Sequence, residues 1–484
     1  MKEKCSNFVS ALQAQGYNDI VFYQPALNIG GGSLVEANLA KCIADNTSMT
    51  VWFCDYPGGY GAFNCVDNPK VKLLNFKESD VNFPLQKKCI LFTNSTRVIL
   101  LKNMHPESKI LFWHYETVKC GWDSVLIQGE TKNYLRLVKD NNSMCYHDWS
   151  ARDSLNRYCG TGFTNSDFIF IPLETKQNRC SPSYVQEDTI NLGFLSRLAI
   201  DKVCALYYLV QNFAEYKTEK KKVLHVIGDG VKAEEAKRIC KEYSEKIEFV
   251  FTGTIAHEDL DDYLTRNIDL LFGLGTSVLE GAALRIPCAP LIIDIKRFED
   301  TDAWWLFDTR DYCVGILKEQ KEDFEKTGAK FTPINTMIDE VYSEGGKEKY
   351  GELCYEYYLK NHSSYTECMM NFFRFAAKST LTFAKILGCI KFVPYNLLKI
   401  TSFKVLGIPL KKIEHGGFMK IVFSKCRYLQ LFKRVTIGRI RKYYILRLKV
   451  LTLNVTRVPY SFPVTKRDDR HIYMSKTIKQ EEVK

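Results

Sequence analysis

Short apolar segments alternate with segments of helical length over most of this 484-residue chain, and this alternation restricts the fold more than any other feature. In the first part, strands are expected at 20–23, 50–53, 89–92, 109–113 and 167–171, with a helix at 34–44 after a glycine run. Short apolar strands separated by helices are typical of parallel sheets that are covered on both faces. The pattern therefore predicts an α/β fold.

The alternation stops in the polar stretch 174–188 and then begins again. Strands at 189–194, 223–227, 247–251 and 268–272 are separated by helices at 203–215, 233–244 and 258–266, and a further helix contains Glu280. Two such halves predict two doubly wound, Rossmann-like domains that face a cleft. We place the first domain at 1–182 and the second, with its closing helices, at 183–378.

Charge is distributed unevenly between these domains and the rest of the chain. From Leu381 onward there are 23 Lys and Arg against 5 Asp and Glu, a balance of +18, whereas the whole chain carries +11. The preceding residues therefore carry −7. We treat 379–484 as a separate basic extension.

Lysines recur every five to eight residues through an otherwise apolar part of this extension, and no uncharged stretch is 18 residues long. This pattern argues against a spanning helix and favours interfacial amphipathic segments on an anionic membrane surface. A nucleic-acid surface and a packed accessory subdomain are the alternatives, although no recognised nucleic-acid module precedes the extension. The lysines are Lys378, Lys385, Lys391, Lys399, Lys404 and Lys411.

The 17 cysteines form no Cys-x-x-Cys pair, their number is odd, and no secretory leader precedes them. This usage indicates reduced thiols and a cytoplasmic protein.

The most informative local segment follows the strand at 268–272. A glycine-rich turn leads into a helix that Thr276 or Ser277 can cap, with Gly275 before them. A helix N-terminus of this kind receives phosphate, and a carboxylate one turn further, Glu280, can accept hydrogen bonds from sugar hydroxyls. The alternative is that Glu280 is a partly buried acid paired with an arginine.

Arg197 and Lys202 lie just after the strand at 189–194, where open α/β sheets bind ligands. The two cations could converge on one diphosphate, although a pair of surface cations would look the same.

Two glycine-containing turns have less specific signals. Gly31 and Gly32 open the first helix and could offer backbone N–H groups to an anion or a sugar, or form a plain flexible loop. Gly228 and Gly230 are better explained as structural corners.

In order and spacing, these features resemble glycosyltransferase family 4 of the GT-B fold over about residues 20–375. The family's Arg-Leu-x-x-x-Lys spacing appears at Arg197–Lys202, and its Val-Gly-x-Gly corner appears at Val226–Gly230. Its Phe-x-Gly-x-Ile segment appears at Phe251–Ile255, and the final Glu of its Glu-x7-Glu pair is Glu280.

The resemblance implies a retaining transferase that uses a nucleotide-sugar and neither a cofactor nor a metal. Arg197 and Lys202 would neutralise the leaving diphosphate, and Glu280 would hold the ribose. The resemblance also implies donor-binding roles for Gly275, Thr276, Ser277, Ile255, Gly31 and Gly32.

A histidine that contacts the sugar is also implied, and His114 at the end of the strand at 109–113 is the first candidate. A structural histidine is the alternative, and His147-Asp148 is a weaker competitor.

One departure concerns Phe272, which stands where the family has the first acid of the Glu-x7-Glu pair. Its presence leaves two hypotheses. The first is a transferase that builds a surface glycan on a lipid-linked or saccharide acceptor, peripheral to the inner face of the cell membrane. The second is a non-catalytic GT-B subunit that acts as a scaffold or regulator.

Overall fold

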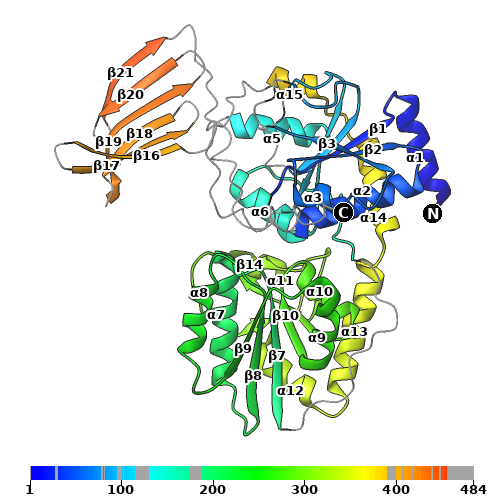
Figure 1. Cartoon of the computed structure of the whole chain (residues 1–484), viewed down its shortest axis with the longest axis vertical. Helices are drawn as coiled ribbons and strands as arrows, with labels where there is room; N and C mark the ends of the chain where they lie inside the picture. Colours follow the sequence, from blue (N-terminus) through cyan, green and yellow to red (C-terminus); the bar gives the residue numbers. More distant parts are fainter. Residues whose placement is uncertain are drawn as a thin grey trace, which may run out of the picture.

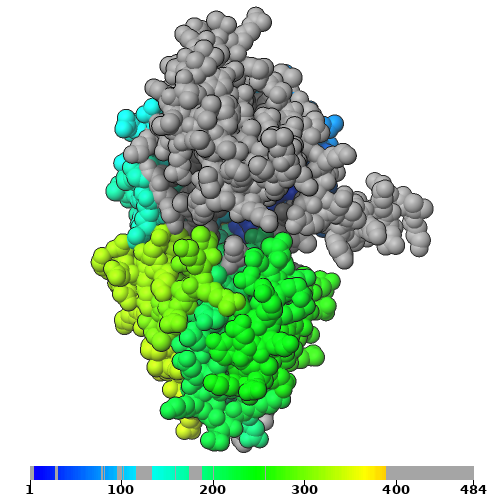
Figure 2. Space-filling model, turned by 90° about the vertical axis from the view of Figure 1, so that its left-hand side faces the viewer, coloured from blue at the N-terminus to red at the C-terminus, as the bar shows by residue number. Residues whose placement is uncertain are grey.

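The computed structural model describes two α/β domains and a separate antiparallel sheet (Figure 1). The described residues are 2–27, 31–77, 80, 82–94, 101, 103–115, 130–173, 188–389, 399–405, 408–415, 418–423, 426–437, 440–445 and 448–454. In a side view the second domain, coloured green to yellow-green, forms one continuous body in the lower half of the molecule (Figure 2).

The first domain contains a six-stranded parallel sheet in the order β3-β2-β1-β4-β5-β6. Every residue of β1, β4 and β5 is buried, because helices cover both faces. The strand order reverses between β1 and β4, where doubly wound sheets open a ligand crevice at their carboxyl ends. The strands are β1 Asp19–Tyr23, β2 Thr50–Asp55, β3 Val71–Asn75, β4 Ile90–Asn94, β5 Lys109–His114 and β6 Met144–Tyr146, and the helices are α1 Lys2–Ala14, α2 Gly31–Asn46, α3 Tyr60–Phe63, α5 Glu130–Asp140 and α6 Trp149–Cys159.

The second domain contains a five-stranded parallel sheet in the order β11-β10-β7-β8-β9. Its strands are β7 Thr189–Leu195, β8 Lys221–Ile227, β9 Glu248–Gly253, β10 Leu270–Gly273 and β11 Cys288–Pro290. Its helices are α7 Ile200–Glu215, α8 Ala233–Lys241, α9 His257–Asn267, α10 Thr276–Ala283, α11 Lys321–Glu325, α12 Ile334–Tyr342 and α13 Gly346–Asn361. Short strands pair as β12 Ile292–Ile293 with β14 Ile316–Leu317 and as β13 Asp302–Ala303 with β15 Thr332–Pro333, and the 3-10 turns are η2 Leu306–Asp308 and η3 Lys318–Gln320.

These two sheets confirm the predicted pair of doubly wound domains. In the first domain the prediction missed β3, β6, α1, α3, α5 and α6, and it was wrong at 167–171, which forms only an isolated bridge between Tyr146 and Phe168. β6 has three residues and is too short for a periodic pattern to identify it.

The predicted domain boundary at 378 places α14, Tyr365–Lys378, in the wrong domain. α14 returns to the first domain and packs on α1 and α2, and the ring of Phe372 lies 5.1 Å from that of Phe92 in β4. α15, Phe383–Cys389, follows it and packs on α5. The apolar face of α14 completes the core of the first domain, which the alternation along the sequence does not reveal.

Hydrogen bonds join the two chain crossings between the domains. The backbone N–H of Leu173 donates to the carbonyl of His362 at 2.8 Å, and the hydroxyl of Tyr358 donates to the carbonyl of Leu173 at 3.1 Å. The Nδ1 atom of His362 lies 2.8 Å from the carbonyl oxygen of Ile171. Burial lowers the pKa of His362 to about 4, so this ring is neutral at neutral pH.

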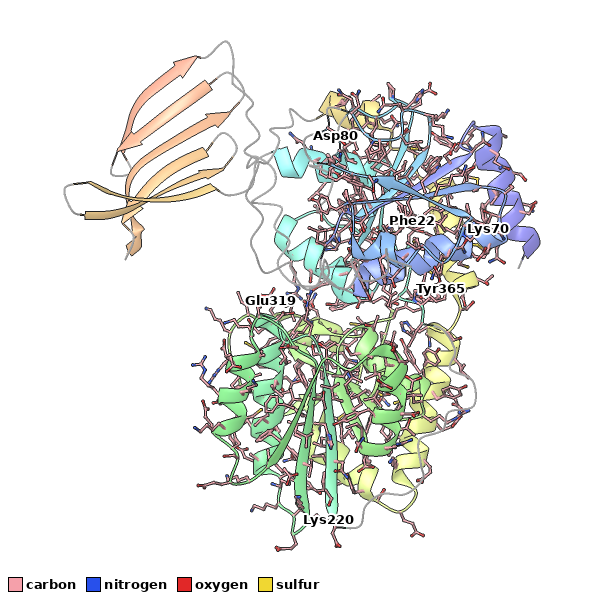
Figure 3. All side chains as sticks on the ribbon, in the orientation of Figure 1. Phe22, Lys70, Asp80, Lys220, Glu319 and Tyr365 are labelled. Carbon is pink, nitrogen blue, oxygen red and sulfur yellow. The ribbon has the colours of Figure 1, made fainter. Side chains whose placement is uncertain are left out.

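A second contact between the domains is made by Gln320, which is fully buried. Its Nε2 atom donates to the carbonyl of Ser150 at 2.9 Å and to the carboxylate of Asp153 at 2.9 Å, and both residues lie on α6. Trp149, at the start of α6, packs within the core of the second domain, with its ring 5.1 Å from that of Phe324. These contacts fix α6 against the second domain. Figure 3 shows Glu319, beside Gln320, at the junction with the first domain.

Part of the basic extension forms a six-stranded antiparallel sheet, in which each strand pairs with the next along the chain. Its strands are β16 Lys399–Val405, β17 Ile408–His415, β18 Phe418–Phe423, β19 Cys426–Ile437, β20 Ile440–Ile445 and β21 Leu448–Asn454. The sequence pattern had not indicated strands here, and 455–484 lie outside the described residues. In the described part of the chain, no helix has the length and apolar character needed to cross a membrane.

Candidate functional site

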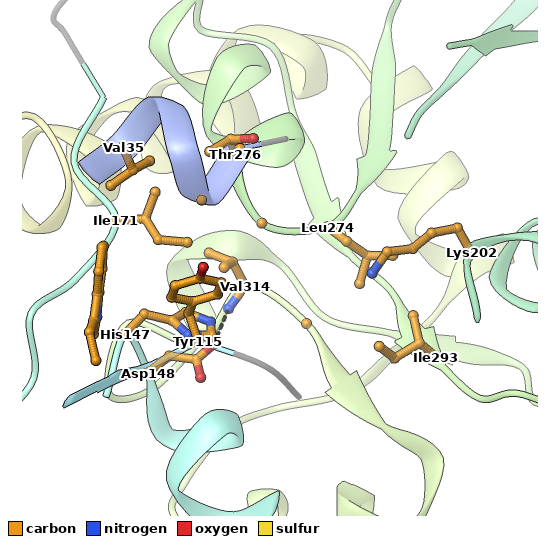
Figure 4. A pocket seen from close by; sticks show the side chains of 15 residues that line it. Val35, Tyr115, His147, Asp148, Ile171, Lys202, Leu274, Thr276, Ile293 and Val314 are labelled. Atoms are coloured by element: carbon orange, nitrogen blue, oxygen red, sulfur yellow. Dashed lines mark hydrogen bonds and ion pairs between the residues drawn. The ribbon is translucent and has the colours of Figure 1, made fainter. Parts of the chain in front are cut away.

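A cleft of about 220 Å³ lies between the carboxyl ends of the two parallel sheets (Figure 4). Its walls come from turns after strands of both domains, as expected for doubly wound folds. The first domain contributes Gly31, Gly32, Val35, Trp113, Tyr115, His147, Asp148 and Ile171, and the second contributes Lys202, Leu274, Gly275, Thr276, Ile293, Val314 and Gly315.

Two helix N-termini meet across this cleft. α2 begins at Gly31 and α10 at Thr276, and a Cβ atom on Gly31 would lie 3.4 Å from the hydroxyl oxygen of Thr276. Helix N-termini present backbone N–H groups and the positive end of the helix dipole to a ligand. The arrangement suits an anion held between the domains.

The predicted cap of α10 is wrong in one respect. Gly275 is the N-cap residue, and no side chain caps the helix. Gly275 has φ 62°, a backbone conformation that favours glycine, and its N–H donates to the carbonyl of Val314 at 2.9 Å. The first-turn N–H groups of Thr276 and its neighbours are therefore not occupied by a side-chain cap.

Lys202 lines the cleft from the first turn of α7, and its Nζ atom lies 3.1 Å from the carboxylate of Asp201. Arg197 lies in the turn before α7, where it is exposed and does not line the cleft. The structure therefore brings only one of the two predicted cations to the cleft.

Gly228 and Gly230 have the structural role predicted for them. A Cβ atom would lie 2.2 Å from the carbonyl oxygen of Ser196 at Gly228, and 2.5 Å from that of Leu198 at Gly230. The N–H of Leu198 donates to the carbonyl of Asp229 at 3.0 Å. This close approach of two turns fixes the backbone that leads from Arg197 into α7.

Three predicted donor-binding residues do not line the cleft. Glu280 lies within α10 with 9% of its surface exposed, and Ile255 packs on the core of the second domain. The N–H of Ser277 donates to the carbonyl of Leu274 at 3.3 Å. Of this segment, Leu274, Gly275 and Thr276 face the cleft.

Phe272, in the position of the missing acid, is fully buried in β10 between Phe194 of β7 and Ala289 of β11. It belongs to the core of the second domain. The cleft wall two residues later is the apolar side chain of Leu274.

The structure does not bring His114 to the cleft, because its side chain is fully buried at the end of β5. Its carbonyl accepts a hydrogen bond from the backbone N–H of His147 at 3.2 Å, and His147 does line the cleft. Of the two candidate histidines, His147 lines the cleft and His114 does not.

Asp148 orients the ring of His147. The Nε2 atom of His147 lies 3.0 Å from Oδ2 of Asp148, which is fully buried and also accepts from the N–H of Val314 in the second domain at 3.4 Å. The other oxygen, Oδ1, caps α6 through the N–H of Ala151 at 2.8 Å. A carboxylate accepts hydrogen bonds, so Nε2 is the protonated nitrogen.

The other ring nitrogen of His147, Nδ1, is buried and is then left without a hydrogen-bond partner in the described part of the protein. With Nε2 donating to Asp148, Nδ1 is the nitrogen of this ring that could accept a hydrogen bond.

Sequence reasoning also missed Asp55, which binds the backbone at Ala26, five residues before Gly31. This fully buried carboxylate accepts from the backbone N–H groups of Ala26, Tyr56 and Ala62 at 2.8, 2.7 and 3.1 Å. Burial raises the pKa of Asp55, and these three hydrogen bonds oppose that rise. An acid at a strand end followed by glycines, Asp55-Tyr-Pro-Gly-Gly, was the available signal.

Gly32 has little free space beside Tyr115. A Cβ atom on Gly32 would lie 3.1 Å from the ring of Tyr115, whose hydroxyl accepts a hydrogen bond from Gln24. The first turn of α2 is therefore in contact with an aromatic side chain of the cleft.

No group of three potential metal ligands occurs among the described residues. Asp300 and Asp302 both pair with Lys321, at 2.8 and 2.7 Å from its Nζ atom.

Comparison with known proteins gives structural similarity only. No family model and no curated protein sequence matches the chain. HepE from Anabaena, solved with UDP and glucose, is 12% identical with a TM-score of 0.44 and covers 72% of this chain and 96% of its own.

Two further glycosyltransferases are similar to the chain to the same degree. The lipopolysaccharide outer core galactosyltransferase WaaB is 13% identical, has a TM-score of 0.47 and covers 73% of this chain and 98% of its own. A glycosyltransferase from Rickettsia africae is 12% identical, has a TM-score of 0.48 and covers 73% and 96%. The assignment of two doubly wound domains rests on the sheet topology described above.

Proposed function

We propose that this protein transfers a sugar from a nucleotide-sugar donor to an acceptor hydroxyl in the cleft. The observation that supports this proposal most directly is the meeting of the α2 and α10 N-termini beside Lys202. Backbone N–H groups, helix dipoles and a lysine together suit a diphosphate.

The proposed reaction retains the anomeric configuration and uses charge from the protein in place of a metal. Negative charge grows on the leaving diphosphate as the glycosidic bond breaks, and preorganised positive groups stabilise it. Lys202 is the cation at the cleft. Arg197 is exposed on the adjoining turn and is proposed as a second cation that reaches the diphosphate when the donor is bound.

The first domain is proposed to hold the acceptor, a glycan or a lipid-linked saccharide. His147 takes the role first expected of His114, because its Nδ1 atom can accept a hydrogen bond from a sugar hydroxyl. Glu280 remains the proposed ribose ligand. It lies one turn into α10, so binding the ribose requires the nucleotide to reach past Gly275.

The basic extension is proposed to attach the enzyme to an anionic membrane on its cytoplasmic side. After residue 380 the chain has 23 lysines and arginines against 5 acids, and this positive excess supports an anionic membrane as the partner. Each lysine or arginine close to such a surface contributes about 1 kcal/mol.

Incubation of the purified chain with labelled nucleotide-sugars tests the proposal. We expect slow release of nucleoside diphosphate from at least one donor, unchanged by a chelator such as EDTA. A loss of turnover with EDTA would contradict the metal-independent mechanism while leaving glycosyl transfer in place.

A non-catalytic subunit is the second candidate, and Phe272 in the acid position favours it. Such a protein would release no nucleoside diphosphate from any donor, even with acceptors present. Thermal stability with a panel of nucleoside diphosphates separates the candidates, because a ligand at 100 times its dissociation constant adds about 2.7 kcal/mol. The absence of any stabilisation would contradict the transferase and favour the scaffold.

A further inference from the structure

A second hollow, of about 400 Å³, lies at the other end of the second domain, where the strands of its sheet begin. Lys220, which precedes the lining residue Lys221, marks this end in Figure 3, far from Glu319 at the junction of the domains. The hollow is therefore distinct from the cleft, and the proposed glycosyl transfer does not use it.

One face of the sheet is polar here, although a parallel sheet covered on both faces is normally apolar. Alternate residues of three adjacent strands point to the hollow, and the register sets Thr189 beside Lys221. On the opposite face of β8, Leu224 and Val226 belong to the core. The polar residues of the sheet that line the hollow are Thr189, Asn191, Lys221, His225 and Glu248.

A buried ion pair also lines the hollow. Nζ of Lys347 lies 2.6 Å from Oδ1 of Asp269, and their side chains are 4% and 6% exposed. The other oxygen of Asp269 accepts from the Tyr342 hydroxyl at 2.7 Å and from the Asn191 side chain at 3.2 Å. A buried pair needs such additional hydrogen bonds, and these fix the wall of the hollow.

Other lining groups have capacity for a ligand. His225 is 7% exposed, and its Nδ1 atom is paired with the hydroxyl of Tyr263 at 2.8 Å, which leaves Nε2. Asn191 and Asn267 donate through Nδ2 within the protein, to Asp269 and to the carbonyl of Tyr263, which leaves their amide oxygens as acceptors.

Two exposed ion pairs stand at the mouth of the hollow. Arg266 is 76% exposed and 3.6 Å from Asp262, and Lys221 is paired with Glu248 at 2.7 Å. Each of the three lining cations, Lys221, Arg266 and Lys347, therefore has a carboxylate partner. Exposed ion pairs contribute little, so Lys221 and Arg266 can exchange their partners for a ligand phosphate at the mouth, and ligand hydroxyl groups suit the polar face of the sheet.

We propose that this hollow binds a phosphorylated sugar. Its phosphate lies at Arg266 and Lys221, and its hydroxyls bind Asn191, Asn267 and His225. The volume falls within the roughly 300–1,000 Å³ typical of small-molecule sites.

Isothermal titration of the full chain with glucose 1-phosphate tests this proposal. We expect saturable binding that Arg266→Ala weakens about tenfold or more, because a charge-assisted hydrogen bond to phosphate is lost. His225→Phe keeps a ring of similar shape and is expected to weaken binding as well. Arg238→Ala removes an exposed cation of α8 outside the hollow and is the matched control.

Three results would overturn the proposal. The first is the absence of saturable binding. The second is binding that Lys202→Ala abolishes but Arg266→Ala does not, which would place the ligand in the cleft. The third is equal affinity for inorganic phosphate, which would indicate an adventitious ion only. Nucleoside diphosphate binding, measured separately, reports on the cleft, so the failure of either proposal can be recognised.

Discussion

Both domains line the cleft with a helix N-terminus and apolar side chains, but the second domain adds a cation, Lys202, whereas the first adds aromatic and acid–base side chains. Gly275, Thr276 and Lys202 offer charge and N–H groups that any diphosphate can use. Trp113, Tyr115 and the His147–Asp148 pair offer shape and one directed acceptor. Under the proposed function, the second domain supplies groups for the diphosphate, and the first domain supplies side chains that surround the sugar and the acceptor.

The largest expected effect concerns Phe272, which lies in the core of the second domain two residues before the cleft residue Leu274. Phe272→Glu would place an unpaired carboxylate among fully buried residues, and we expect it to lower the free energy of unfolding by about 3–5 kcal/mol. Urea denaturation measures the change. Phe272→Leu, which keeps an apolar residue of similar size, is the control and should cost about 1.5 kcal/mol or less. A stable Phe272→Glu protein with a new donor preference would show that this position faces the ligand.

The next effect concerns Lys202, the cation that the second domain contributes to the cleft. Lys202→Ala should lower turnover by about 10²–10³, the scale for loss of one group that stabilises transition-state charge. Arg197→Ala is the matched comparison, and we expect a smaller loss because Arg197 does not line the cleft. Steady-state kinetics with the best donor measure both variants. Equal losses would show that Arg197 reaches the diphosphate as fully as Lys202 does.

The smallest effect concerns His147, which the first domain contributes to the cleft. His147→Ala removes the proposed acceptor of one sugar hydroxyl, and we expect about a tenfold loss in kcat/KM, the scale of one hydrogen bond. The same variant should make little difference to a donor analogue that lacks the hydroxyl in question. Asp148→Asn, which lets Nε2 become the unprotonated nitrogen, should resemble His147→Ala. A loss that is equal for every deoxy analogue would indicate a structural role.

The sequence predicted the second domain better than the first. Its first two strands, β7 and β8, have seven residues each and are separated by the regular helix α7, so these strands and the glycine corner at Gly228 follow from local patterns. In the first domain, β6 is short and Asp55 acts through three backbone N–H groups that lie up to 29 residues away in the chain. Such contacts leave only a weak local signal.

The sequence by itself determined the two doubly wound sheets, the strand-to-helix turns at their carboxyl ends and the basic excess after residue 380, because these depend on periodicity, glycine and charge. Only the tertiary structure decided which turn residues face the cleft. In the folded protein, Lys202 and His147 line the cleft whereas Arg197 and His114 do not, and α14 packs in the first domain. The physical reason is that side-chain direction and domain packing depend on contacts between distant segments, such as Asp148 with Val314, whereas secondary structure follows largely from neighbours in the chain.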